Sequence, residues 1–128
     1  MPFKFEKLEV WNESVELSAL VHQVTLTFPK DELYVLTSQI RRAADSVSLN
    51  LAEGSTGQTN AEFRRFLSFL IRSGVEVIGC IYLARKRNII SQKDFSSIYA
   101  LTDNLVMRIQ ALKKSIPIIK PKQSSVDR

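Results

Sequence analysis

The apolar residues of this chain recur every three or four positions in four consecutive segments, which is the spacing of amphipathic helices. The first predicted helix covers about residues 8–28 and ends before Pro29, because a proline disfavours a helical residue before it. The second predicted helix covers about residues 31–53. Its apolar positions form a heptad-like seam of Leu33, Leu36, Ile40, Ala43, Val47 and Leu51.

Polar residues mark where the later helices begin and end. Gly54 is expected to be the left-handed residue just after the second helix. Thr59 and Ser91 are each followed three positions later by an acidic residue, so both are expected to cap a helix N-terminus. The third helix then covers about residues 60–87, and the fourth covers about residues 91–116.

The third segment is apolar on more than one side, which predicts a helix that is either central in the fold or part of a subunit interface. Charged side chains interrupt its apolar run at Arg64, Arg65, Arg72 and Glu76. We therefore do not expect it to span a membrane.

Four amphipathic helices with short connections predict an all-α, antiparallel, up-down-up-down four-helix bundle over residues 1–116. No segment shows the alternation of a β-strand, and the chain has no internal repeat. Its length of 128 residues fits one domain. Residues 117–128 contain prolines, serines and charges, and we expect them to form a mobile basic tail.

The formal net charge of +5 is distributed unevenly along the chain. Residues 1–60 carry 5 Lys or Arg and 8 Asp or Glu, whereas residues 61–128 carry 13 Lys or Arg and 5 Asp or Glu. This asymmetry indicates either a basic surface that binds a polyanion or merely solvated helix faces.

Seven basic residues of the second half are candidates for phosphate contacts. No RNA-recognition sheet, KH loop or zinc finger is apparent, so binding would be mainly electrostatic and poorly selective for sequence. The candidate nucleic-acid-binding residues are Arg64, Arg65, Arg85, Lys86, Arg87, Lys113 and Lys114.

The sequence holds no recognisable catalytic or metal-binding constellation, so we expect neither enzymatic activity nor a cofactor. His22 is the single histidine, and Cys80, the single cysteine, lies in an apolar helical stretch. One cysteine excludes an internal disulfide, and residues 1–16 contain no apolar signal segment, so a reducing cytoplasm is the expected compartment.

Several carboxylates lie on the predicted helices, but the Glu-x-x-His repeats of a di-iron bundle are absent. Pairing with arginine is the better interpretation, because the planar guanidinium holds a carboxylate at two points. The expected structural ion pairs, within or between subunits, involve Arg41, Arg42, Glu53, Glu62 and Glu76.

Several blocks of the chain resemble one protein family. The blocks are residues 5–11, 28–29, 36–44 and 50–54, together with Glu62-Phe63, Phe66-Leu67, Ser73 and Glu76. They resemble the four-helix-bundle proteins encoded within intervening sequences of bacterial 23S ribosomal RNA genes. The block from Leu36 to Ala44 is the most specific of them.

The resemblance implies a four-helix bundle that assembles into a ring, typically a homopentamer, without enzymatic activity. Related proteins are accessory factors of diversity-generating retroelements, where they bind a reverse transcriptase and nucleic acid through a basic surface. The chain departs from the family at Ser48, where a proline usually kinks the second helix, and at Arg72, Ile78 and residues 87–89.

Two hypotheses follow. In the first, the protein is a non-enzymatic helical oligomer that binds RNA or DNA through its basic surface. In the second, it is a protein-only scaffold or accessory factor for a polymerase or a neighbouring gene product.

Overall fold

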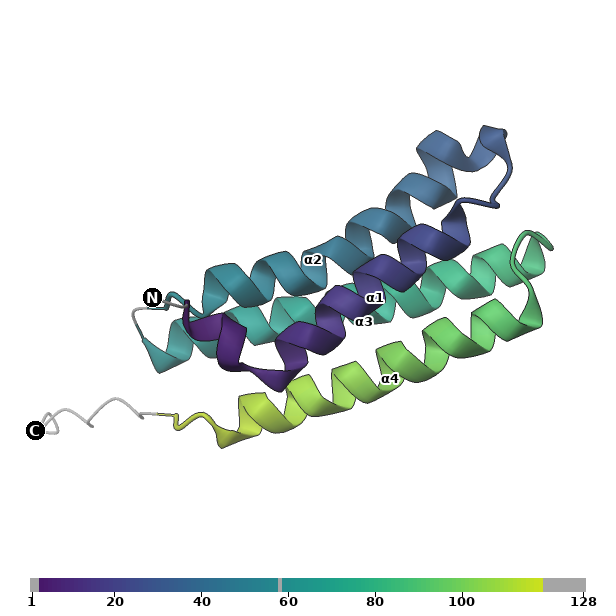
Figure 1. The fold of residues 1–128 in the computed structure, drawn as a ribbon. Coiled ribbons are helices and arrows are strands. Elements are labelled where there is room, and N and C mark those ends of the chain that lie inside the picture. Colours follow the sequence, from purple (N-terminus) through teal and green to yellow (C-terminus); the bar gives the residue numbers. More distant parts are fainter. Residues whose placement is uncertain (1–2, 58, 119–128) are drawn as a thin grey trace, which may run out of the picture.

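The computed structural model describes residues 3–57 and 59–118 (Figure 1). Within these residues the chain forms four α-helices: α1 (Glu9–Thr25), α2 (Ser38–Gly54), α3 (Asn60–Lys86) and α4 (Gln92–Ser115). Short 3-10 turns cover Lys4–Lys7 and Lys30–Glu32, and a π-helical turn covers Leu33–Thr37. Apart from Pro117 and Ile118, the predicted tail lies outside the described residues.

Each helix runs antiparallel to the one before it (Figure 1). The neighbouring pairs are α1 with α2, α2 with α3, α3 with α4, and α1 with α4. Since the four pairs close on themselves, α1 and α3 lie on one diagonal of the bundle, and α2 and α4 lie on the other. The predicted all-α antiparallel bundle is confirmed.

The core lies between all four helices. Leu17 of α1, Ile40 of α2, Leu70 of α3 and Ile98 of α4 are completely buried. Removing such a side chain from water stabilises the fold by about 1.5–3 kcal/mol. The helical spacing of apolar residues in the sequence therefore identifies the main stabilising contacts.

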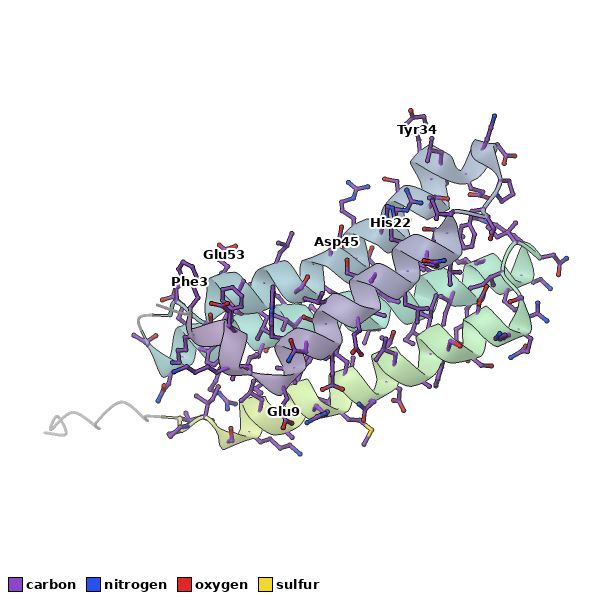
Figure 2. All side chains as sticks on the ribbon, viewed as in Figure 1. Phe3, Glu9, His22, Tyr34, Asp45 and Glu53 are labelled. Atoms are coloured by element: carbon purple, nitrogen blue, oxygen red, sulfur yellow. The ribbon has the colours of Figure 1, made fainter. Side chains whose placement is uncertain are left out.

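The connection between α1 and α2 differs from the prediction. The seam assigned Leu33 to the inner face of a regular helix, but its exposed fraction is 42%. The turn Leu33–Thr37 is π-helical, so it holds more residues than an α-helical turn and rotates the preceding residues away from the seam. Tyr34 in the same turn is 89% exposed, and Figure 2 shows it at this corner, pointing away from the bundle.

The prediction that Gly54 adopts a left-handed conformation was wrong, because no described glycine has a positive φ. Gly54 is the last residue of α2 and is buried against α3. An ideal Cβ built at Gly54 would lie 2.5 Å from the Cβ of Phe66. The glycine is needed here for the close approach of the two helices.

The left-handed residue occurs instead at Asn88, after α3, where φ is 59°. The amide of Asn88 donates to the Arg85 carbonyl at 3.1 Å, and the amide of Ile89 donates to the Ala84 carbonyl at 3.0 Å. These two bonds form a Schellman motif, which asparagine tolerates better than most residues other than glycine.

Both predicted N-caps are present. The hydroxyl of Thr59 accepts from the amide of Glu62 at 3.0 Å, and that of Ser91 accepts from the amide of Asp94 at 3.1 Å. α2 continues through Ser48, whose hydroxyl donates to the Asp45 carbonyl at 3.1 Å. The departure from the family proline therefore leaves an uninterrupted helix.

By length and composition alone, α3 could cross a membrane. The core helix of a helical bundle meets the same criterion, and here α3 packs against both α2 and α4.

Candidate nucleic-acid interface

Arg64 joins the beginning of α3 to the end of α4. Its Nη1 donates to the carbonyl of Lys113 and, at 3.1 Å, to the carbonyl of Ile116. The last carbonyls of a helix have no partner within that helix, and a cation near them is also favoured by the helix dipole. Arg64 therefore caps α4 from the neighbouring helix.

An open groove between α3 and α4 begins at this contact. It has a volume of about 580 Å³ and is lined by Arg64, Ser68, Ile71, Arg72, Gln110, Lys113 and Lys114. Four of these seven residues are cationic and none carries a carboxylate. Cationic side chains without a neighbouring acid produce a positive potential that attracts phosphate groups.

Arg72 was not among the predicted contacts, although it lines this groove. Arg64, Ser68 and Arg72 follow one another at intervals of four, which places them on one face of α3. That spacing was available in the sequence. The three residues Arg64, Lys113 and Lys114 were predicted, and the structure brings them together with Arg72.

Three of the four remaining predicted residues, Arg85, Lys86 and Arg87, lie at the opposite end of α3. Twenty-one residues separate Arg64 from Arg85, which corresponds to roughly 30 Å along an α-helix. Arg85 donates to the carbonyl of Ile90 at 3.0 Å, and Arg87 forms an ion pair with Glu32 at 2.9 Å. Two of these three cations thus fix the turn after α3 and the α1–α2 corner, and Lys86 is exposed.

Arg65 lies outside the groove. Its guanidinium carbon is 5.7 Å from the centroid of the Phe69 ring, and with Phe69 it lines a separate depression. The seven predicted contacts therefore divide among three places on α3, the adjoining turn and α4.

The expected ion pairs are not formed within the part of the chain that the structure describes. Arg41 donates to the hydroxyl of Thr25 at 2.8 Å, and Arg42 donates to that of Ser38 at 3.2 Å. Glu76 accepts from the side-chain amide of Gln39 at 3.4 Å. Among the described residues, no intrachain ion pair involves Arg41, Arg42, Glu53, Glu62 or Glu76. Their pairing between subunits stays a prediction.

The ion pairs that do form connect other helices. Arg108 of α4 contacts Glu9 and Glu13 of α1, the latter at 2.8 Å. Asn104 also donates to Glu13 at 2.8 Å. Sequence patterning could not identify these partners, because about a hundred residues separate them along the chain.

The residues considered for catalysis are not assembled into a site. Cys80 is buried, and the pKa of its thiol is raised to about 11, mainly by desolvation and also by nearby Glu76, with Arg87 opposing the shift. A thiol with so high a pKa is a poor nucleophile near neutral pH. His22 is exposed on α1, and the described chain has no cluster of three or more potential metal ligands.

The fold and the groove define a class: a small antiparallel four-helix bundle with a cationic groove between two helices. Residues 6–111 match the family model of the 23S rRNA-intervening sequence protein, and the chain belongs to this family. No curated protein matches the chain.

One similar solved structure is a protein of unknown function from the S23 ribosomal protein family of Bacteroides thetaiotaomicron. The two chains share 18% identity with a TM-score of 0.75, over 83% of this chain and 99% of the other. At this level of identity, the likeness supports the four-helix fold alone.

Proposed function

We propose that this protein is a non-enzymatic, self-associating helical bundle that binds nucleic acid in the groove between α3 and α4. The observation that supports this proposal is the convergence of Arg64, Arg72, Lys113 and Lys114 on one groove without a carboxylate in its lining. Because Arg64 already holds the end of α4, the principal phosphate contacts are Arg72, Lys113 and Lys114.

The chemistry of the groove suits a phosphate backbone more than base edges. Its cations neutralise phosphates, and Gln110 adds a polar hydrogen-bonding side chain. Contacts of this kind fix position and supply affinity, but they carry little sequence information. We therefore expect binding with weak sequence preference and strong dependence on salt.

Self-association is supported by the apolar surface of α3. Val75, Tyr82 and Leu83 of this helix are exposed, although large apolar side chains near one another usually mark an interface. The family resemblance implies a ring, most typically a pentamer. A ring would repeat the groove once per subunit, so several weak phosphate contacts would act together on one nucleic acid.

A salt titration with structured RNA tests the binding proposal. Arg72→Ala/Lys114→Ala should weaken binding and make the slope of log affinity against log salt shallower, by on the order of one for each phosphate that the variant no longer neutralises. Lys30→Ala/Lys93→Ala removes the same formal charge from two exposed positions at the other end of the bundle and should change binding much less. Equal weakening in both variants, or no binding at low salt, would contradict the proposal.

The alternative is a protein-only scaffold for a polymerase or a neighbouring gene product. The exposed apolar residues at the α1–α2 corner, including Leu26, Tyr34 and Val35, favour a protein contact. Co-purification from the native cell with and without nuclease separates the two functions. A partner retained after nuclease treatment, together with no affinity for RNA, would favour the scaffold.

A further inference from the structure

No contact or backbone conformation within the chain explains why residue 79 is a glycine. It lies in the interior of α3, its φ is not positive, and an ideal Cβ built there meets no atom within 4 Å. A glycine in the middle of a helix costs about 0.5–1 kcal/mol relative to alanine. Neither backbone conformation nor internal packing accounts for this cost.

The residues around Gly79 form an exposed apolar surface. Val75 is 59% exposed, and Tyr82 and Leu83 are 55% and 48% exposed. They lie one turn before and one turn after Gly79, on the same outward side of the helix. We call Val75, Gly79, Tyr82 and Leu83 the α3 stripe. Its centre has no side chain, so another helix can approach the backbone closely at that point.

We infer that the α3 stripe binds the outward face of α1 from a second copy of this chain. That face carries Val15 and Ala19, and Leu26, the residue directly after α1, continues it; all three are exposed. The small Ala19 lies four residues after Val15, as Gly79 lies four after Val75. We call these three residues the α1 stripe. This inference rests on the self-association proposed above and specifies its surfaces.

Charge complementarity supports α1 as the occupant. α1 contains three carboxylates and no lysine or arginine. Glu9 and Glu13 already pair with Arg108 of α4, so the carboxylate that α1 offers to a second copy is the exposed Glu16, three residues before Ala19. α3 contains five cations against two carboxylates, and Arg72 and Lys86 are both exposed near the ends of its stripe. Opposite charges on the two helices favour their encounter and fix which surfaces meet.

A symmetric contact between two α3 stripes is disfavoured by the same charges. If two copies crossed antiparallel at Gly79, residues equally far before and after it would face each other. Arg72, seven positions before Gly79, would then lie opposite Lys86, seven positions after it. Like charges placed opposite one another across an interface oppose binding.

The position of the two helices determines the kind of assembly. α1 and α3 lie on a diagonal of the bundle, so their outward faces point to opposite sides. Each copy then offers two different faces, and a contact between them is heterologous. Such contacts continue until a ring closes, or they extend as a filament; they do not stop at a dimer.

Two size-matched variants test the inference by light scattering after gel filtration. Gly79→Leu fills the centre of the α3 stripe, and Ala19→Leu fills the centre of the α1 stripe. Each variant alone should lower the assembled mass to that of the 14.6 kDa chain. Mixed together, they should form a dimer of twice that mass, because Gly79→Leu keeps an intact α1 stripe and Ala19→Leu keeps an intact α3 stripe.

Ala100→Leu is the control, since Ala100 is exposed on α4 outside both stripes and should leave the assembled mass unchanged. Dimer formation in the mixture also shows that both variants are folded. If the unmodified protein is monomeric, the proposed self-association fails as well. Two results would overturn the assignment of the surfaces while leaving self-association intact. In the first, the unmodified protein assembles and either single variant assembles to the same mass. In the second, the mixture of the two variants stays monomeric.

Discussion

Gly74 and Gly79 lie five residues apart in the same helix and face opposite directions. An ideal Cβ at Gly74 would lie 2.6 Å from Cγ2 of Val106 in α4, whereas one at Gly79 would meet nothing. The first glycine is explained by packing within the chain, and the second is not. Residues on the inner side of α3 should therefore determine stability, and those on its outer side should determine assembly.

The largest expected effect is from Gly74→Val, which places two methyl groups where α4 already packs. Forcing extra volume into a tightly packed contact destabilises by about 1–3 kcal/mol. The melting temperature and urea midpoint should both fall. Gly79→Val is the matched control. With both substitutions measured in the Ala19→Leu background, where assembly does not contribute, it should leave the free energy of unfolding nearly unchanged. Equal destabilisation by both substitutions would contradict the prediction that only the inner side of α3 determines stability.

Cys80 follows Gly79 and lies on the inner side of α3. The burial of its thiol can be tested by measuring how stability depends on pH. Burial raises the pKa of its thiol to about 11 from an ordinary value of 9.0, so the unfolded chain releases this proton first. The unfolded state therefore binds fewer protons than the folded state between pH 9 and 11, and stability falls as pH rises through that range. The loss should approach about 2 kcal/mol by pH 11.

Chemical denaturation at roughly pH 8, 9, 10 and 11 measures this loss. Lysines and tyrosines titrate in the same range, so Cys80→Ala serves as the reference. The difference in slope between the two proteins belongs to the thiol. A slope that is the same in both would indicate that the thiol is solvated in the folded protein.

Arg64 and Arg72 extend the comparison to two cations of the same groove. Arg64→Met removes the hydrogen bonds to the Lys113 and Ile116 carbonyls and should destabilise by about 1–2 kcal/mol. Arg72→Met should change stability by less than about 0.5 kcal/mol, because Arg72 is exposed. Thermal unfolding of both variants tests this order. The reverse order would mean that Arg72, and not Arg64, holds α3 to α4.

The smallest expected effect is an increase in the free energy of unfolding. Gly79→Ala should stabilise the isolated chain by about 0.5–1 kcal/mol, since alanine is the better helix former and its Cβ meets no atom. The measurement belongs in the Ala19→Leu background, where assembly does not contribute. A decrease in stability there would show that the Cβ is obstructed within the chain.

The sequence predicts the helices well, because each buries a face whose residues recur at the helical period. It identifies both N-caps at Thr59 and Ser91, since capping depends on residues three positions apart. It assigned the wrong conformation to Gly54, because the close approach of Phe66 is a tertiary contact that no local pattern records.

The candidate site was only partly predictable for a related reason. Counting basic residues located the basic half of the chain, but it could not tell which guanidinium groups already bind carbonyls or carboxylates of the same chain. Arg64, Arg85 and Arg87 are used in this way. Arg72 was noted in the sequence as an interruption of an apolar run and as a departure from the family, and its spacing with Arg64 could have identified it as part of the groove.

The π-helical turn Leu33–Thr37 makes α2 tolerant of a change in length at one place. A π turn is an α-helical turn with one residue inserted, so deletion of a residue there restores the regular helix. Deletion of Val35, which is exposed, would leave the register of Ile40 and of all later residues unchanged. The residues before the deletion, including Tyr34, would rotate about the axis of α2 by about 100°. Insertions and deletions in this turn can reorient the exposed corner without repacking the bundle.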